Sequence, residues 1–103
     1  MHRSIIVAAA FVSGVGAACA QAPADGAAIV KANCGACHAI SGAPPPAGPV
    51  GPSFVDIARM PSTTALSLKV FMRSSHRNMP NFIMNADEID AVAAYILDLA
   101  QKQ

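Results

Sequence analysis

The residues with the clearest chemistry lie in one short segment, Cys34-Gly35-Ala36-Cys37-His38. Residues three and four apart share one face of a helical turn, so both thiols and the imidazole can point at the same object. Two thiols can add across the two vinyl groups of a haem to form thioethers, while the histidine binds the iron. Cys-x-x-Cys-His is the spacing typical of c-type haem attachment. The segment therefore predicts one covalently bound haem.

Two other interpretations of the cysteine pair stay open at the level of the motif. A thioredoxin-like redox pair requires a βαβ setting, and the sequence has no convincing strand pattern. A structural zinc site requires four ligands. Residues 21–103 hold two cysteines and two histidines, and His38 follows Cys37 directly, which suits a tetrahedron poorly. Because so short a motif can occur by chance, the haem interpretation needs the support of a second iron ligand elsewhere in the chain.

The start of the chain has the pattern of a secretory signal peptide. Residues 2–3 form a short basic head, residues 5–18 an apolar run, and residues 18–20 a small-residue cleavage site. The apolar run is shorter and richer in alanine and glycine than a membrane-spanning helix. We therefore expect residues 1–20 to be removed on export, and residues 21–103 to form one small domain in the periplasm.

Cys19 offers an alternative to cleavage after Ala20, because a cysteine at this place can become the acylated first residue of a lipoprotein. The residue three positions before it is Gly16, where an aliphatic side chain is expected. Cleavage after Ala20 is therefore favoured. Without lipidation at Cys19, we expect the protein to meet a membrane only through a partner.

Composition and charge argue against a nucleic-acid-binding protein and indicate a small domain that needs a cofactor to complete its core. The chain has seven Lys and Arg residues against six Asp and Glu, so no strongly basic field favours nucleic acid. A short domain without tryptophan, and with one tyrosine and three phenylalanines in residues 21–103, cannot easily bury a self-sufficient core. A disulfide between Cys34 and Cys37 would close too small a loop to help. A covalent haem would fill the missing core.

The spacing of apolar residues and of capping residues predicts an all-α domain with three main helices and a short helical turn. The apolar stripe is clearest in the last helix, where capping residues and apolar spacing agree. We expect a first helix from Gly26 to Ala32 capped by Asp25, a short turn from Ser53 to Ala58, a middle helix capped by Thr63 and running to about Ser74, and a last helix capped by Asn85 with Glu88 completing a capping box.

Apolar and basic side chains both recur at helical spacing in the middle helix. The apolar residues, which we expect to face the core, are Leu68, Phe71 and Met72. The basic residues are Lys69, Arg73 and Arg77, of which at least the first two share an outward face. A solvated face is the simplest interpretation of these cations, and a docking patch for an acidic partner is the alternative.

The sixth position of a haem iron separates electron carriers from catalysts and sensors. The available donors are Met60, Met72, Met79, Met84 and His76. Core packing accounts for Met72 and Met84, and an exposed helix end accounts for His76. Met79 precedes a proline, which fixes the backbone, and lies between two helices in a segment without helix signals. We therefore predict Met79 as the distal ligand, with the other donors left as alternatives.

Taken in order, these residues make the chain resemble the class I cytochrome c family over nearly all of residues 21–103. The matching residues are Gly26 eight positions before Cys34, the motif Cys34–His38, Gly51-Pro52-Ser53-Phe54, Leu68 and Phe71, Met79-Pro80-Asn81-Phe82, Asp87-Glu88-Ile89, and Tyr95-Ile96-Leu97. The Met-Pro pair is weak alone, but the order and spacing of the whole set are specific. The resemblance implies the cytochrome c fold.

The resemblance also implies a role for each candidate site residue. Cys34 and Cys37 would carry the thioethers of one haem c, and His38 and Met79 would be the two iron ligands. Pro52 would offer its backbone carbonyl to the other ring N–H of His38, which fixes the orientation of the imidazole.

Outside the site, Gly26 and Tyr95 would lie where the first and last helices cross. The chain departs from the family pattern at residues 44–46, which are all proline, and at Ser75, where relatives often have proline. Residues of the proline-rich loop are therefore not assigned roles, and the end of the middle helix is left open.

The implied function is that of a monomeric, non-enzymatic single-electron carrier of a respiratory chain. Its partners would be periplasmic redox proteins such as a dehydrogenase, a cytochrome bc1-type complex or an oxidase. One alternative is a haem c subunit bound permanently to a periplasmic dehydrogenase or oxidase. Another is a five-coordinate gas-binding or peroxidase-like haem protein.

Overall fold

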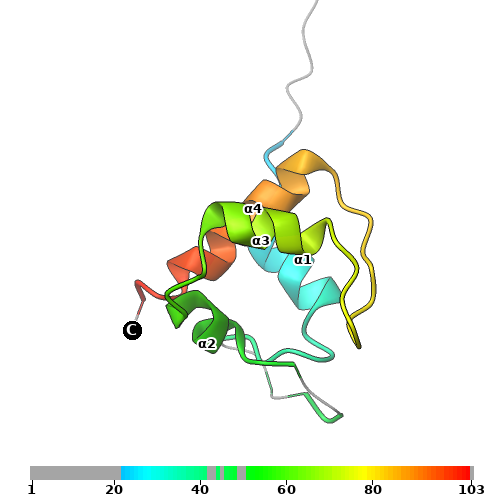
Figure 1. The fold of residues 1–103 in the computed structure, drawn as a ribbon, viewed down its shortest axis with the longest axis vertical. Helices are drawn as coiled ribbons and strands as arrows, with labels where there is room; N and C mark the ends of the chain where they lie inside the picture. Colours follow the sequence, from blue (N-terminus) through cyan, green and yellow to red (C-terminus); the bar gives the residue numbers. More distant parts are fainter. Residues whose placement is uncertain (1–21, 42–43, 45, 49–50, 103) are drawn as a thin grey trace, which may run out of the picture.

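The computed structural model describes residues 22–41, 44, 46–48 and 51–102. Over these residues the fold is all-α, as predicted, and contains no strand (Figure 1). The helices are α1 (Gly26–Asn33), α2 (Phe54–Arg59), α3 (Ala65–Met72) and α4 (Ala86–Asp98). The expected signal peptide, with Cys19, lies outside the described residues.

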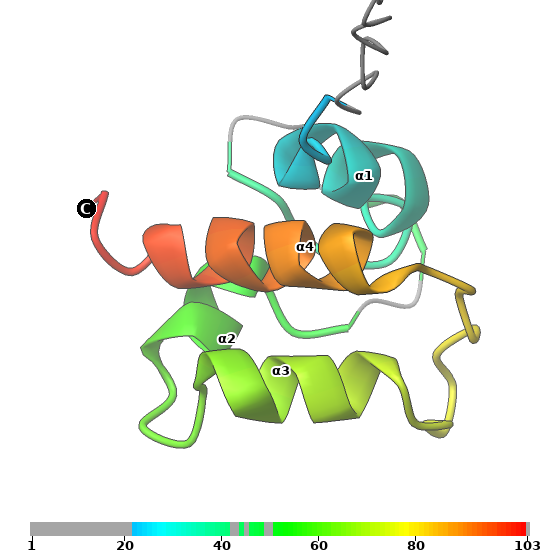
Figure 2. The same ribbon diagram turned by 90° about the horizontal axis from the view of Figure 1, so that it is seen from above.

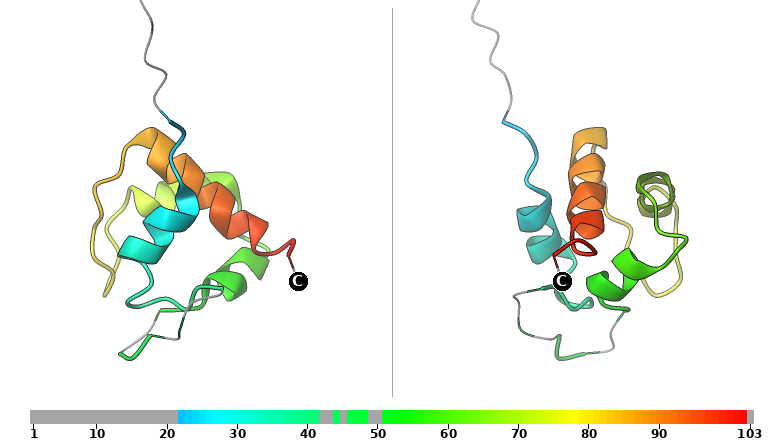
Figure 3. Two further views of the ribbon diagram at one scale, coloured as in Figure 1. Left: turned by 180° about the vertical axis from the view of Figure 1, so that it is seen from behind. Right: turned by 90° about the vertical axis from the view of Figure 1, so that its left-hand side faces the viewer.

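The last helix is the centre of the fold. Helices α1, α2 and α3 each pack against α4, and α4 lies between α1 and α3 in two perpendicular views (Figures 2 and 3). The buried apolar side chains come from all four helices, from Ile40 and from Leu99 just after α4; they are Val30, Ile40, Phe54, Ala58, Leu68, Ile89, Val92, Ala93, Ile96 and Leu99. Among the described residues, no helix combines the length and the hydropathy needed to cross a bilayer.

Capping residues set most of the helix starts, and the expected caps of the first and last helices are confirmed. The Asp25 side chain accepts from the Ala28 N–H at 3.1 Å. In α4, Asn85 and Glu88 exchange two hydrogen bonds of 3.0 and 2.8 Å between side chain and backbone. Such reciprocal bonds satisfy donors that a helix start would otherwise leave without partners.

The predicted cap of the middle helix is wrong by one residue, and its end, which the sequence left open near Ser74, lies two residues earlier. Its cap is Thr64 rather than Thr63, and the helix ends at Met72. Thr64 accepts from the Ser67 N–H at 3.1 Å, and the Ser67 hydroxyl accepts from the Thr64 N–H at 2.8 Å. The equivalent partner of Thr63 would be Leu66, which has no polar side chain, so only Thr64 can form the reciprocal pair.

The crossing of α1 and α4 explains the glycine at the start of α1. A Cβ added to Gly26 would lie 2.6 Å from the Ala91 carbonyl carbon and 3.2 Å from the Tyr95 Cβ. The two backbones therefore approach too closely for any side chain at position 26. The expected crossing at Gly26 and Tyr95 is confirmed.

The predicted faces of α3 are only partly correct. Leu68 is buried and Met72 half-buried, but Phe71 is 44% exposed and stacks on the His76 ring at a centroid distance of 3.4 Å. The outward position expected for Lys69 is found only in part, because its side chain is 34% exposed and its ammonium forms an ion pair of 2.8 Å with Asp90 of α4. A carboxylate on the neighbouring helix turns this cation toward the α3–α4 contact.

Candidate functional site

The Cys34–His38 segment continues directly from α1 as a further helical turn. The Cys34 N–H donates to the Val30 carbonyl at 2.9 Å, and the His38 N–H donates to the Cys34 carbonyl at 2.9 Å. Helix α1 thus sets the direction in which the two cysteines and the histidine leave the backbone. The predicted three- and four-residue spacing on one turn is present in the structure.

The two thiols have different surroundings. Cys34 is half-buried against the apolar core, and burial raises the pKa of its thiol, whereas Cys37 is exposed. Both cysteines are free. The all-α fold lacks the βαβ setting of a thioredoxin-like pair. Within the described part of the chain, no three His, Cys, Asp or Glu side chains gather as a zinc site would require.

His38 is held from three sides. Its Nδ1–H donates to the Pro52 carbonyl at 2.7 Å, the contact that the resemblance implied. Its ring lies 4.9 Å from the Phe54 ring between centroids. A Cβ at Gly51 would lie 2.8 Å from Nδ1 and 2.9 Å from Nε2. With Nδ1–H donating, the neutral ring keeps the lone pair of Nε2 for a metal.

The segment that holds His38 in place is itself tied to the attachment turn. The Gly51 N–H donates to the Cys37 carbonyl at 2.8 Å, and the Phe54 N–H donates to the Ala39 carbonyl at 3.1 Å. Sequence reasoning assigned no such role to Gly51 or Phe54. The signal that could have found them is the Gly51-Pro52 pair, since a glycine beside a contacting proline suggests a close backbone approach.

Met79 lies at the end of a tight turn between α3 and α4. His76 and Met79 face each other in an antiparallel bridge, and Asn78 has a φ of 62°. A positive φ at the third residue of a four-residue turn is typical of type II turns, and asparagine tolerates it well. The proline at position 80 then fixes the backbone after Met79.

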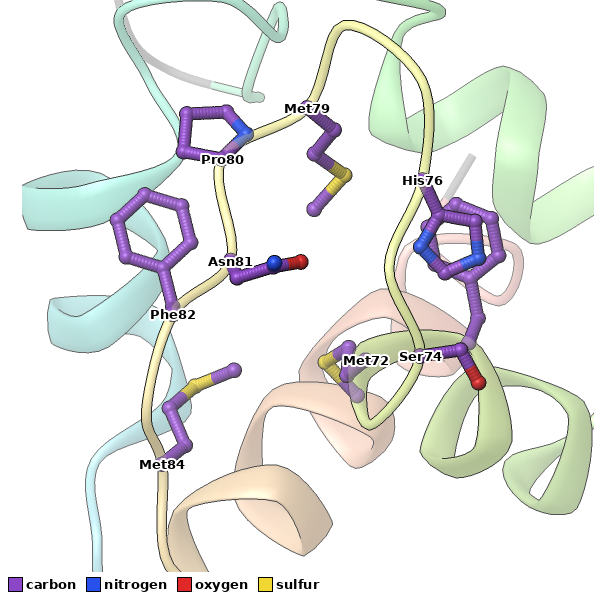
Figure 4. A pocket seen from close by; sticks show the side chains of 9 residues that line it. Met72, Ser74, His76, Met79, Pro80, Asn81, Phe82 and Met84 are labelled. Atoms are coloured by element: carbon purple, nitrogen blue, oxygen red, sulfur yellow. The ribbon is translucent and has the colours of Figure 1, made fainter.

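The Met79 thioether points into a small pocket of about 20 Å³ (Figure 4). Its lining residues all come from the end of α3 and the connection to α4; they are Phe71, Met72, Ser74, His76, Met79, Pro80, Asn81, Phe82 and Met84. Three of the alternative donors, Met72, Met84 and His76, therefore share the pocket with Met79. Met60 does not line this pocket and is 47% exposed.

The predicted site residues form two groups in the structure. Cys34, Cys37, His38 and Pro52 are joined through the attachment turn and the His38–Pro52 hydrogen bond. Met79 lies in a pocket whose lining does not include His38. A free imidazole nitrogen and a thioether are a donor set that suits haem iron. The two free thiols suit a haem as well, and so does Gly51, which leaves room for the His38 ring.

Comparison with known families identifies the class. The family model described as cytochrome c oxidase, cbb3-type, subunit III matches residues 21–96. No curated protein and no solved structure matches the chain. The matched range contains the attachment turn, Pro52, Met79 and most of α4. The chain therefore belongs to the family of cbb3-type cytochrome c oxidase subunit III domains, and is a c-type cytochrome that binds haem and carries electrons.

Proposed function

We propose that residues 21–103 are an exported, periplasmic domain that moves single electrons through one haem c. Cys34 and Cys37 would attach the haem by thioether bonds, and His38 and Met79 would be the two protein ligands of its iron. The observation that carries the proposal is the hydrogen bond of 2.7 Å from His38 Nδ1 to the Pro52 carbonyl, which leaves Nε2 available to iron. In this proposal the domain carries electrons for its partners and is not itself an enzyme.

Each residue of the site has a defined task in this proposal. Bound haem supplies an iron that cycles between two oxidation states, at a potential that histidine and methionine ligation raises. The Pro52 carbonyl fixes the tautomer and plane of the His38 ring. Gly51 leaves room for that ring. The turn ending at Met79 presents the thioether on a stiff backbone, which favours small structural change on electron transfer.

A second candidate function is that of a permanent haem c subunit in a terminal oxidase or a similar redox complex. The family match favours it. Leu66 and Val70 support it too, because they lie one turn apart on α3 and are 71% and 57% exposed. A stable partner would cover such side chains. Size-exclusion chromatography of the native protein separates the two: a free carrier elutes at its own mass, and a subunit elutes with its complex.

The proposed iron ligands are tested by spectroscopy of the oxidised protein and its Met79→Ala variant. Sulfur ligation gives a weak near-infrared band, which we expect in the wild type and in Met60→Leu, and expect Met79→Ala to lose. Met84→Leu removes another thioether from the same pocket and should keep the band.

Persistence of the band in Met79→Ala would show that Met79 is not the ligand. Rapid carbon monoxide binding by the reduced wild type would instead indicate the five-coordinate alternative.

A further inference from the structure

We propose that His76 is a second distal ligand of this chain, which binds the iron whenever the Met79 thioether is not bound to it. The inference rests on the proposed function, because it concerns the same iron. It adds a metal-binding role for a histidine that the assignment of Met79 leaves without one.

The turn places the two side chains next to each other. His76 and Met79 are the opposed residues of an antiparallel bridge, separated by only two residues. Opposed residues in such a pair project their side chains to the same side of the ribbon, with Cβ atoms about 4.5–5.5 Å apart. The two side chains thus leave the backbone close together, on a turn that the left-handed Asn78 keeps tight. The His76 ring lies on the outer side of its arm (Figure 4), so a rotation of its side chain would bring it toward the Met79 sulfur.

Both side chains also line the same pocket. Met79 points its sulfur into the space between the two arms of the segment, and the His76 ring lies along the opposite arm (Figure 4). Met72 and Met84 line this pocket as well. His76 is, however, the one lining residue with an imidazole, and imidazole nitrogen is a common ligand of iron.

A weak contact keeps the imidazole beside the pocket. The His76 ring stacks on the Phe71 ring at 3.4 Å between centroids and 20° between planes. Ring stacking is weak compared with a bond to iron. The stack therefore keeps the imidazole beside the pocket but is weak enough to break when the imidazole binds iron.

Ligation by His76 would change the electron chemistry without opening the site. Replacing a methionine ligand with a second histidine lowers the reduction potential, because methionine ligation raises it. The iron would also stay six-coordinate, and external ligands would still have to displace a protein side chain.

The test compares haem-loaded Met79→Ala with two double variants. In the oxidised Met79→Ala protein we expect a low-spin, six-coordinate iron by electron paramagnetic resonance, without the near-infrared sulfur band. In Met79→Ala/His76→Phe we expect a high-spin iron, and carbon monoxide binding to the reduced form at least tenfold faster. The phenylalanine keeps a ring for the Phe71 stack but carries no nitrogen.

Two matched variants remove the other donors of the pocket. Met79→Ala/Met72→Leu and Met79→Ala/Met84→Leu should both stay low-spin. A high-spin Met79→Ala protein, or a low-spin Met79→Ala/His76→Phe protein, would overturn the inference. Absence of the near-infrared band from the wild type would instead contradict the Met79 assignment. Failure of the His76 inference and failure of the proposed function are therefore distinguishable.

Discussion

At the scale of single residues, the position of His38 depends on the backbone facing it as much as on the imidazole. Gly51 lies against the ring, and its neighbour Pro52 accepts the Nδ1–H. The Cys34–His38 spacing can be recognised from sequence because its chemistry is local to one turn. The approach of Gly51 to His38 is set by chain folding across a long loop, and the left-handed Asn78 by turn closure. Neither feature can be predicted from local sequence patterns.

A methyl group at position 51 should disturb the site. In Gly51→Ala the new Cβ would overlap the His38 ring, which should cost about 1–3 kcal/mol of stability. For a domain of this size that lowers the melting temperature by roughly 4–8 °C per kcal/mol. Thermal unfolding of the haem-loaded protein measures it.

Gly48→Ala is the control for this substitution, because a Cβ there meets no atom within 4 Å. Its stability should change by less than about 0.5 kcal/mol. Equal melting temperatures for the two variants would mean that Gly51 does not constrain His38.

At the scale of elements, α4 organises the molecule by packing against each of the other three helices. Its start could be predicted because Asn85, Glu88 and the apolar stripe all indicate the same helix. The start of α3 was misplaced by one residue, because two adjacent threonines compete for the cap and only Thr64 has Ser67 as its partner. The exposed position of Phe71 follows from its stacking on His76, which helical spacing does not encode.

The α1–α4 crossing should not tolerate a side chain at its closest point. Gly26→Ala would place a Cβ against the Ala91 carbonyl and force the helices apart, at a cost of about 1–3 kcal/mol. That loss should exceed the gain in helix propensity, which is at most about 1 kcal/mol. Chemical denaturation measures the difference.

Ala27→Ser changes the next, exposed residue of α1 and should alter stability by less than about 0.5 kcal/mol. A Gly26→Ala protein as stable as the wild type would show that the helices can separate without cost.

At the scale of the whole molecule, the net charge is only +1, but the basic and acidic residues are unevenly distributed along the sequence. No acidic residue occurs between Asp56 and Asp87, a stretch that holds four basic residues, whereas four of the six acidic residues lie between Asp87 and Asp98. The salt bridge to Asp90 neutralises Lys69 in part. Arg73 and Arg77 are exposed and are therefore the better candidates for contact with an acidic partner.

Electron transfer to an acidic partner should therefore slow as salt is added, since the Debye length is only about 8 Å at physiological ionic strength. An acidic single-copper electron-transfer protein is a suitable partner for stopped-flow kinetics. Arg73→Gln and Arg77→Gln should flatten the salt dependence more than Lys69→Gln does.

Lys31→Gln removes an exposed cation from α1 and should leave the slope as in the wild type. A rate independent of salt in the wild-type protein would show that Arg73 and Arg77 are solvated surface residues and not a docking patch.

Mass spectrometry of the exported protein determines whether Cys34 and Cys37 hold one haem covalently, as we propose. The protein is treated with a thiol-alkylating reagent under denaturing conditions and digested with trypsin, and the peptide spanning residues 32–59 is weighed. If both cysteines hold the haem, this peptide has its own mass plus one haem, with neither cysteine alkylated. A peptide without haem, carrying two alkylated cysteines, would contradict it.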